Sequence, residues 1–188
     1  MNTRLLFAII GLLAIVGFSG WLLYQEEVIH PSEERSEQDS PDYSISTFTI
    51  TEHDDQGLPL YDIQGEEMIH YPKSDRLTIS RPLFRSYQHQ TVLWQAESES
   101  AQIDNQSRVV TMQGKTTLHY FQRSDQPPTI IHSSDMIIEP DEKIAQSQAP
   151  TRIETVDGHI NAAQGFVLDG EKKRLSMSGG VTSEIRHD

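Results

Sequence analysis

The segment Val109-Val-Thr-Met-Gln-Gly-Lys115 places two apolar side chains, Val110 and Met112, on one face of a short strand. Three other segments repeat this alternation of apolar or small residues with polar ones: Arg76-Leu-Thr-Ile-Ser-Arg-Pro82, Ile144-Ala-Gln-Ser-Gln-Ala-Pro150 and Arg174-Leu-Ser-Met-Ser-Gly-Gly180. The four alternating cores begin at positions 77, 110, 145 and 175, which are 33, 35 and 30 residues apart. A second strand pattern and a polar turn precede each copy. The repeat predicts about four β-hairpins side by side, each burying its apolar face against its neighbours.

The rest of the chain after residue 41 continues this alternation. Tyr43-x-Ile45-x-x-Phe48-x-Ile50 begins the pattern, and Leu118-x-Tyr120 and Val181-x-x-x-Ile185 extend it. Turn residues such as Asp54-Asp55-Gln56-Gly57 separate the runs. Short alternating runs with regularly spaced turns are typical of an antiparallel all-β sandwich or barrel-like sheet. We identify no amphipathic helix in this part of the sequence.

A different pattern begins the chain. Residues 5–24 contain no charged side chain and are long enough for a helix to cross the roughly 30 Å hydrocarbon core of a membrane. A cleaved signal peptide would have a shorter apolar run, but Trp21-Leu-Leu-Tyr24 continues past the small residues Ser19 and Gly20. We therefore predict residues 1–4 in the cytoplasm, a retained transmembrane helix at 5–24, a flexible linker at 25–41 and an exported β domain at 42–188.

Composition excludes several classes of function. The formal net charge is −13, which disfavours binding to nucleic acid phosphates. The chain has no cysteine, so it has no disulfide framework, thiolate zinc site or cysteine nucleophile. About 30% of residues 25–188 are apolar, against about 45–50% in a typical domain. The exported domain therefore has little with which to fill a thick core.

The polar residues form no recognisable catalytic or metal-binding motif. None of the eight histidines has HExxH or HxH spacing, and GxSxG, SxxK and GxxxxGK[ST] motifs are absent from the sequence. His53-Asp54-Asp55 comes nearest to a metal-binding cluster, but aspartate also favours turns. We predict no enzyme activity, no metal site and no cofactor.

The alternating apolar residues of the predicted hairpins form a stripe, and this stripe is the sequence feature that suggests a function. On one face it predicts a set of candidate lipid-binding residues: Phe48, Ile50, Leu77, Ile79, Val110, Met112, Leu175 and Met177. A dry sandwich core would use the same residues. A partly open sandwich would instead take up an apolar ligand, to which unbranched methionine adapts well. The residues alone leave these two interpretations open.

Both ends of the predicted sheet lack the proline and lysine residues that usually block edge strands. Such edges can pair with a strand of another protein. The candidate edge residues are Ser44, Ser46, Thr49 and Thr51 at the N-terminal end, and Val181, Ser183 and Ile185 at the C-terminal end.

The whole layout resembles the LptC family of the lipopolysaccharide export machinery. The residues that carry the resemblance are Ser46–Tyr61, Ile79-Ser-Arg-Pro82, Trp94–Ala101 and Thr155-Val-Asp-Gly158, in this order and spacing. The resemblance implies a β-jellyroll that is open along one side, on a single-pass inner-membrane protein with a periplasmic domain. It also implies that Phe48, Ile79 and the Leu175/Met177 strand line the lipid path, and that Gly57 and Gly158 serve turns.

The same resemblance implies the partners. Lipopolysaccharide from the ABC transporter would pass through the interior of the β-jellyroll. The N-terminal edge would continue a transporter membrane subunit, the C-terminal edge would continue the periplasmic bridge protein LptA, and the membrane helix would pack against the transporter. The alternative is a bitopic scaffold of the cell envelope that binds only proteins and has a dry core.

Overall fold

Alternating sequence and polar turns produce an all-β domain in the computed structural model, which describes residues 40–104, 106–122 and 126–185. Within this part there is no helix of the length and apolarity needed to cross a membrane. The predicted membrane helix at 5–24 and most of the predicted linker lie outside the described residues. The all-β prediction is confirmed for the described part of the chain.

Thirteen strands follow one another along the described residues, and their pairings are antiparallel. They are β1 (Tyr43–His53), β2 (Pro59–Tyr71), β3 (Arg76–Ser80), β4 (Leu83–Gln88), β5 (Thr91–Asp104), β6 (Val109–Tyr120), β7 (Thr129–Glu139), β8 (Ile144–Ser147), β9 (Thr151–Thr155), β10 (Gly158–Ala162), β11 (Phe166–Asp169), β12 (Arg174–Met177) and β13 (Val181–Ile185).

The predicted hairpin repeat is present as four strand pairs: β2 with β3, β5 with β6, β7 with β8, and β11 with β12. The turn of each hairpin has a residue with positive φ just before the second strand. These residues are Asp75, Arg108, Lys143 and Lys173, with φ between 48° and 56°. Their separations reproduce the sequence repeat.

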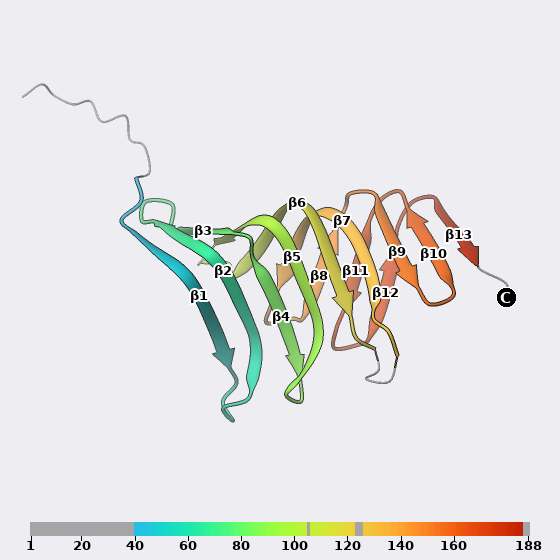
Figure 1. Cartoon of the computed structure of the whole chain (residues 1–188), viewed down its shortest axis with the longest axis horizontal. Helices are drawn as coiled ribbons and strands as arrows, with labels where there is room; N and C mark the ends of the chain where they lie inside the picture. The colour runs from blue at the N-terminus through green and yellow to red at the C-terminus, as the bar shows by residue number, and fades with distance from the viewer. Residues whose placement is uncertain (1–39, 105, 123–125, 186–188) are drawn as a thin grey trace, which may run out of the picture. The chain divides into compact units, whose positions relative to one another are not determined.

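The strands form two layers that share their longest members. Layer A contains β3, β8, β11 and β12, and layer B contains β4, β9, β10 and β13. Strands β1, β2, β5, β6 and β7 run through both layers, so that one half of each pairs in layer A and the other half in layer B. Figure 1 shows β8, β11 and β12 on the far side of the domain, behind the strands of layer B. The result is a sandwich whose layers are joined along one side by continuous strands.

We call the boundary between the layers the fold line. The backbone is irregular there: Thr47, Arg81, Gly114 and Asp135 have positive φ, and the β6–β7 register shifts between Met112 and Lys115. A register shift bends a strand away from its neighbours' direction. The fold line is therefore a row of bends that crosses successive strands.

Hydroxyl side chains line the inside of the fold line. Thr116, Ser147 and Thr151 are buried there, and the Ser133 hydroxyl contacts Ser147 Oγ at 3.0 Å and Thr151 Oγ1 at 2.9 Å. The Ser147 hydroxyl donates to the Ser134 carbonyl at 2.7 Å. Buried backbone carbonyls need such partners because an unpaired polar group is costly in an apolar interior.

Gly65 lies on the fold line opposite Phe48, where the two layers approach closely. A Cβ atom at this position would lie 2.5 Å from Ile79 Cγ2 and 2.9 Å from the Phe48 ring. Ile79 is only 1% exposed and is β-branched, so it cannot move aside freely. Glycine is required here for space.

We expect Gly65→Ala to lower the free energy of unfolding by about 1–3 kcal/mol through overpacking. Urea denaturation followed by circular dichroism measures this. Gly180→Ala is the matched control, because a Cβ at Gly180 meets no atom within 4 Å. Equal urea midpoints for Gly65→Ala and Gly180→Ala would contradict the conclusion that Gly65 is required for space.

Candidate functional site

The inner faces of the two layers carry rows of apolar side chains that cross successive strands. Strand register defines three rows. Row 1 is Ile45, Met68, Ile79, Ala101, Met112 and Met136. Row 2 is Leu77, Ile103, Val110, Ile138, Ala145, Leu168 and Leu175. Row 3, in layer B, is Ile50, Ile63, Phe84, Ala96, Leu118, Ile131, Ile153 and Ile160.

The structure places the predicted lipid-binding residues on this one interior. Ile79, Val110 and Met112 belong to the buried core, and Phe48, Leu77, Leu175 and Met177 are half-buried and pack against it. Ile50 faces inward opposite the buried Ile63 but is 40% exposed, because β1 is an edge strand. The eight residues therefore face the same interior, and Ile50, from layer B, lies at its margin.

Sequence reasoning missed most of the layer B half of the interior. Phe84, Ala96, Leu118, Ile131 and Ile153 are each at most 1% exposed. They lie on strands or strand halves outside the repeated segments, so an alignment of the repeats could not find them. The alternation Leu118-x-Tyr120 was the available signal.

Aromatic side chains fill the interior farthest from the fold line. Phe84 stacks on Tyr61 and on Trp94, with ring centroids 5.4 Å and 5.2 Å apart. Trp94 Nε1 is buried and has no hydrogen-bond partner among the described residues. Burial raises the pKa of the Tyr120 hydroxyl, which lies on the strand next to Trp94. This end of the interior therefore combines apolar rings with a polar donor that a ligand could satisfy.

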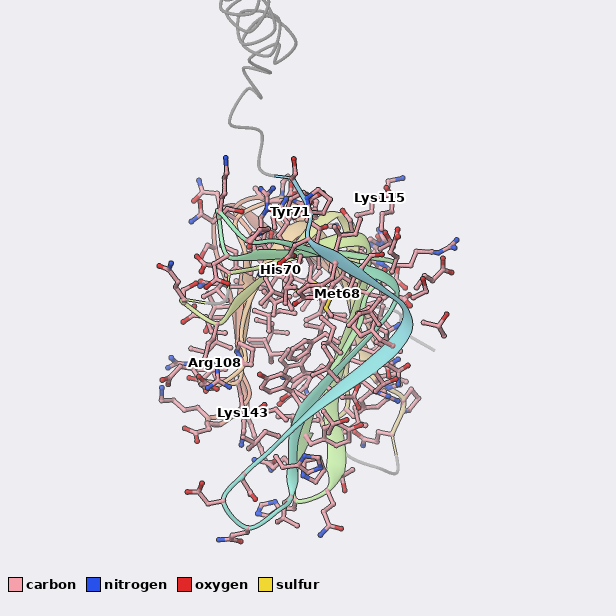
Figure 2. All side chains as sticks on the ribbon, turned by 90° about the vertical axis from the view of Figure 1, so that its left-hand side faces the viewer. Met68, His70, Tyr71, Arg108, Lys115 and Lys143 are labelled. Carbon is pink, nitrogen blue, oxygen red and sulfur yellow. The ribbon has the colours of Figure 1, made fainter. Side chains whose placement is uncertain are left out.

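The side of the sandwich opposite the fold line is the open side, where hairpin turns of layer A meet layer B. Arg108, in the β5–β6 turn, donates to the Tyr61 hydroxyl at 3.4 Å and lies 3.5 Å from Glu52. Figure 2 shows Arg108 and Lys143 together on one flank of the molecule, away from Lys115. Since Glu52 and Tyr61 belong to the layer B halves of β1 and β2, Arg108 connects the two layers across the open side.

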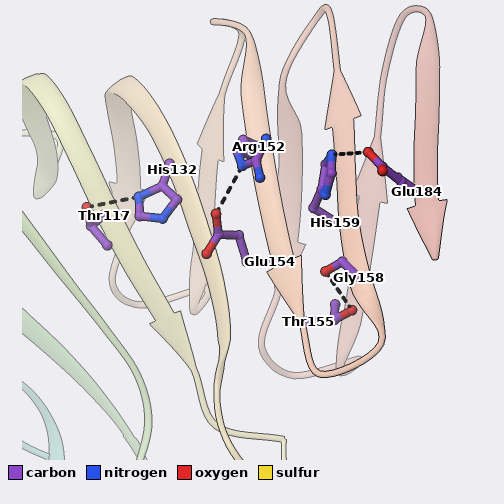
Figure 3. Close-up of polar contacts among 8 residues, drawn as sticks. All are labelled: Thr117, His132, Arg152, Glu154, Thr155, Gly158, His159 and Glu184. Atoms are coloured by element: carbon purple, nitrogen blue, oxygen red, sulfur yellow. Dashed lines mark hydrogen bonds and ion pairs between the residues drawn. The ribbon is translucent and has the colours of Figure 1, made fainter. Parts of the chain in front are cut away.

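The outer face of layer B is polar. The Thr117 hydroxyl lies 3.4 Å from His132 Nδ1, Arg152 lies 3.0 Å from Glu154, and His159 lies 3.3 Å from Glu184. Figure 3 shows these contacts on the outer side of the strands. The Arg152 guanidinium lowers the pKa of Glu154. Solvated hydrogen bonds and an ion pair of this kind suit a water-facing surface, whereas the inner face is apolar. An apolar ligand would therefore contact the inner face.

Acidic and histidine side chains do not converge on a metal site in the parts of the chain that we describe. His53, Asp54 and Asp55 lie around the β1–β2 turn, where Asp54 Oδ1 accepts hydrogen bonds from the backbone of Gln56 and Leu58. Gly57 ends that turn with φ 79°, and Gly158 begins β10 with φ 153°. Gly57 thus belongs to the β1–β2 turn, whereas Gly158 is already the first residue of a strand.

The edge strands are those with one hydrogen-bonded neighbour. At the N-terminal end β1 pairs with β2. It carries Ser44 and Ser46 in its layer A half and Thr49 and Thr51 in its layer B half. At the C-terminal end there are two edges, β12 in layer A and β13 in layer B. Strand β13 contains Val181, Ser183 and Ile185.

The start of β1 is held by a histidine on β2. His70 Nδ1 lies 2.8 Å from Asp42 Oδ1, and its ring stacks on Tyr43 with centroids 4.8 Å apart. A hydrogen bond to Asp42 raises the pKa of His70, although partial desolvation opposes it. The protonated ring therefore stabilises the beginning of the N-terminal edge.

We expect this stabilisation to be complete below the unfolded-state pKa of about 6.5 and to be lost as pH rises through the raised pKa of His70. Hydrogen exchange of the Tyr43–Ile45 amides, measured from pH 5 to 8, checks this. His70→Gln should remove the pH dependence specific to these amides. An unchanged profile in the variant would exclude His70 as its source.

The chain matches a protein-family model. The model described as "Lipopolysaccharide-assembly, LptC-related" matches residues 9–186. A search of curated proteins finds no match.

Proposed function

Because the chain belongs to the LptC family, which acts in lipopolysaccharide transport as a bridging component and is not an enzyme family, we propose a specific role for its β domain. The domain receives lipopolysaccharide from the inner-membrane ABC transporter and passes it through its interior to the periplasmic bridge protein LptA. Family members are in general periplasmic proteins anchored in the inner membrane. The predicted helix at 5–24 would be this anchor.

The observation that carries the proposal is the continuous apolar interior. Rows 1 to 3 cross strands from β1 to β12 and β10, so apolar side chains extend from the N-terminal edge to the C-terminal end. Transfer of acyl chains onto such a surface is favourable by about 25 cal/mol per Å² of apolar area removed from water. Met68, Met112 and Met136 in row 1 can repack around a flexible chain.

The interior is well packed in this structure, and this observation favours the second candidate, a scaffold that binds only proteins. Ala96, Met112, Leu118 and Ile138 are 0% exposed. For lipid uptake the two layers must separate on the open side, where Arg108 connects them. The two candidates therefore differ in whether lipid reaches the inner face during export.

We expect a photo-crosslinking residue at Ile79 or Met177 to capture lipopolysaccharide during ATP-driven export, because both face the interior. Thr78 is the matched control, since it precedes Ile79 on β3 and faces outward. Met177 is half-buried, so substitution there tests the proposal even if substitution at Ile79 disturbs folding. Capture from Thr78 alone, or from none of the three positions, would favour the protein-only scaffold.

We expect the two ends of the sheet to capture different proteins. A crosslinker at Thr49 on β1 should capture a transporter membrane subunit, and one at Ser183 on β13 should capture LptA, because exposed edges add strands by backbone pairing. Thr117, in the middle of layer B, is the control and should capture neither. Mass spectrometry of the adducts checks this. Capture of LptA from Thr49 and of a transporter subunit from Ser183 would contradict the proposed assignment of the two ends.

A further inference from the structure

A cleft of about 620 Å³ lies between the layers on the open side. Layer B supplies the β4–β5 turn, the start of β5 and the end of β6. Layer A supplies Lys173, from the β11–β12 turn. The volume falls within the range of about 300–1,000 Å³ that is usual for small-ligand sites. The lining residues are Gln88, Gln90, Thr91, Val92, Leu93, Gln95, Tyr120, Phe121, Gln122 and Lys173.

The residues that line the cleft include a cation, neutral hydrogen-bond donors and apolar side chains, which is the combination that an amphiphile requires. Lys173 is its one charged residue, and none of the ion pairs among the described residues involves it. Four glutamine amides and one threonine hydroxyl add hydrogen-bond donors, whereas Leu93 and Tyr120 also belong to the buried core. The lining thus combines one cation and neutral hydrogen-bond donors with side chains of the apolar interior.

The backbone around the cleft is strained. His89, Gln90 and Lys173 have φ of 48°, 64° and 50°, although none is glycine. A left-handed conformation is unfavourable at a residue other than glycine, because its Cβ approaches the following carbonyl oxygen. Glycine or asparagine would relieve the strain at the β4–β5 turn. Lys173 shares its positive φ with the other three hairpin turns of layer A, whereas His89 and Gln90 form the β4–β5 turn, in which Gln90 lines the cleft.

We propose that this cleft binds the phosphate of an amphiphile whose acyl chains occupy the apolar interior. Lys173 pairs with the phosphate oxygens, the glutamine amides donate to the remaining oxygens, and Leu93, Tyr120 and Phe121 contact the first methylene groups. The chain carries a net charge of −13, so an anionic head group needs a local cation of this kind. The inference rests on the proposed function, because it requires the interior to accept apolar chains.

The test uses the full chain in a neutral detergent and measures ligand binding by tryptophan fluorescence. The chain has two tryptophans, and the background substitution Trp21→Phe leaves Trp94, between Leu93 and Gln95, as the reporter. Octyl phosphate, 1-octanol and inorganic phosphate are the three probes. We expect Lys173→Gln to weaken octyl phosphate binding about tenfold, which corresponds to about 1.4 kcal/mol, and to leave 1-octanol binding unchanged. Lys173→Arg should retain binding of octyl phosphate, and both variants keep a non-glycine residue at the strained position.

Lys115→Gln is the matched control, because Lys115 is an exposed lysine of layer B that lies outside this cleft. It should bind octyl phosphate as the parent does. Equal binding by Lys173→Gln and the parent, or an equal loss in Lys115→Gln, would overturn the site. If inorganic phosphate binds as tightly as octyl phosphate, the cleft is a site for a free anion and the proposal of an amphiphile is wrong.

The outcomes also separate this inference from the proposed function. If 1-octanol binds but substitution of Lys173 does not change the affinity for octyl phosphate, the phosphate site in the cleft is wrong, whereas uptake of apolar chains by the interior is still supported. If neither octyl probe binds the parent chain, apolar uptake fails and the cleft inference fails with it.

Discussion

The rest of the domain depends on how the backbone bends at the fold line without leaving buried polar groups unpaired. A strand that bends loses regular pairing at the bend, and its carbonyls then need other donors. Ser147 donates to the Ser134 carbonyl, Thr151 to the Ala149 carbonyl at 3.0 Å, and Thr116 to the Gly114 carbonyl at 3.3 Å. These local hydrogen bonds provide donors for carbonyls at the bends of β6 and β7 and in the β8–β9 connection. The apolar rows face each other because the shared strands continue from one layer into the other.

A sandwich made in this way has chemically different sides. Its inner face is apolar, its outer layer B face carries ion pairs, and its open side brings Arg108 and Lys173 of layer A against layer B. The sequence has few apolar residues for its length, yet the structure concentrates them in three rows. The acidic net charge is likewise uneven, since the cleft beside Lys173 contains no acidic side chain among its lining residues. An amphiphile would therefore meet both kinds of surface at the open side.

The hairpins could be predicted from sequence because each short strand of layer A carries its own alternation and turn, as at Leu77/Ile79 and Leu175/Met177. The fold line could not, since Thr47, Arg81 and Asp135 adopt positive φ without glycine or asparagine to signal it. The cleft was also missed, because Lys173 and the β4–β5 turn are far apart in sequence and meet only through layer packing. The sequence did identify both ends as edges, but the division of the C-terminal end into β12 and β13 follows from topology.

The sharing of β1, β2, β5, β6 and β7 between the layers limits how the layers can separate. Sliding one layer past the other would break strand ladders at the bends. Rotation of the layers about the fold line leaves the ladders of each layer intact. The displacement in such a rotation grows with distance from the axis, so contacts near Trp94 and Tyr61 separate most and those near Gly65 least. The domain can thus widen gradually from one side while its hydrogen-bonded framework is preserved.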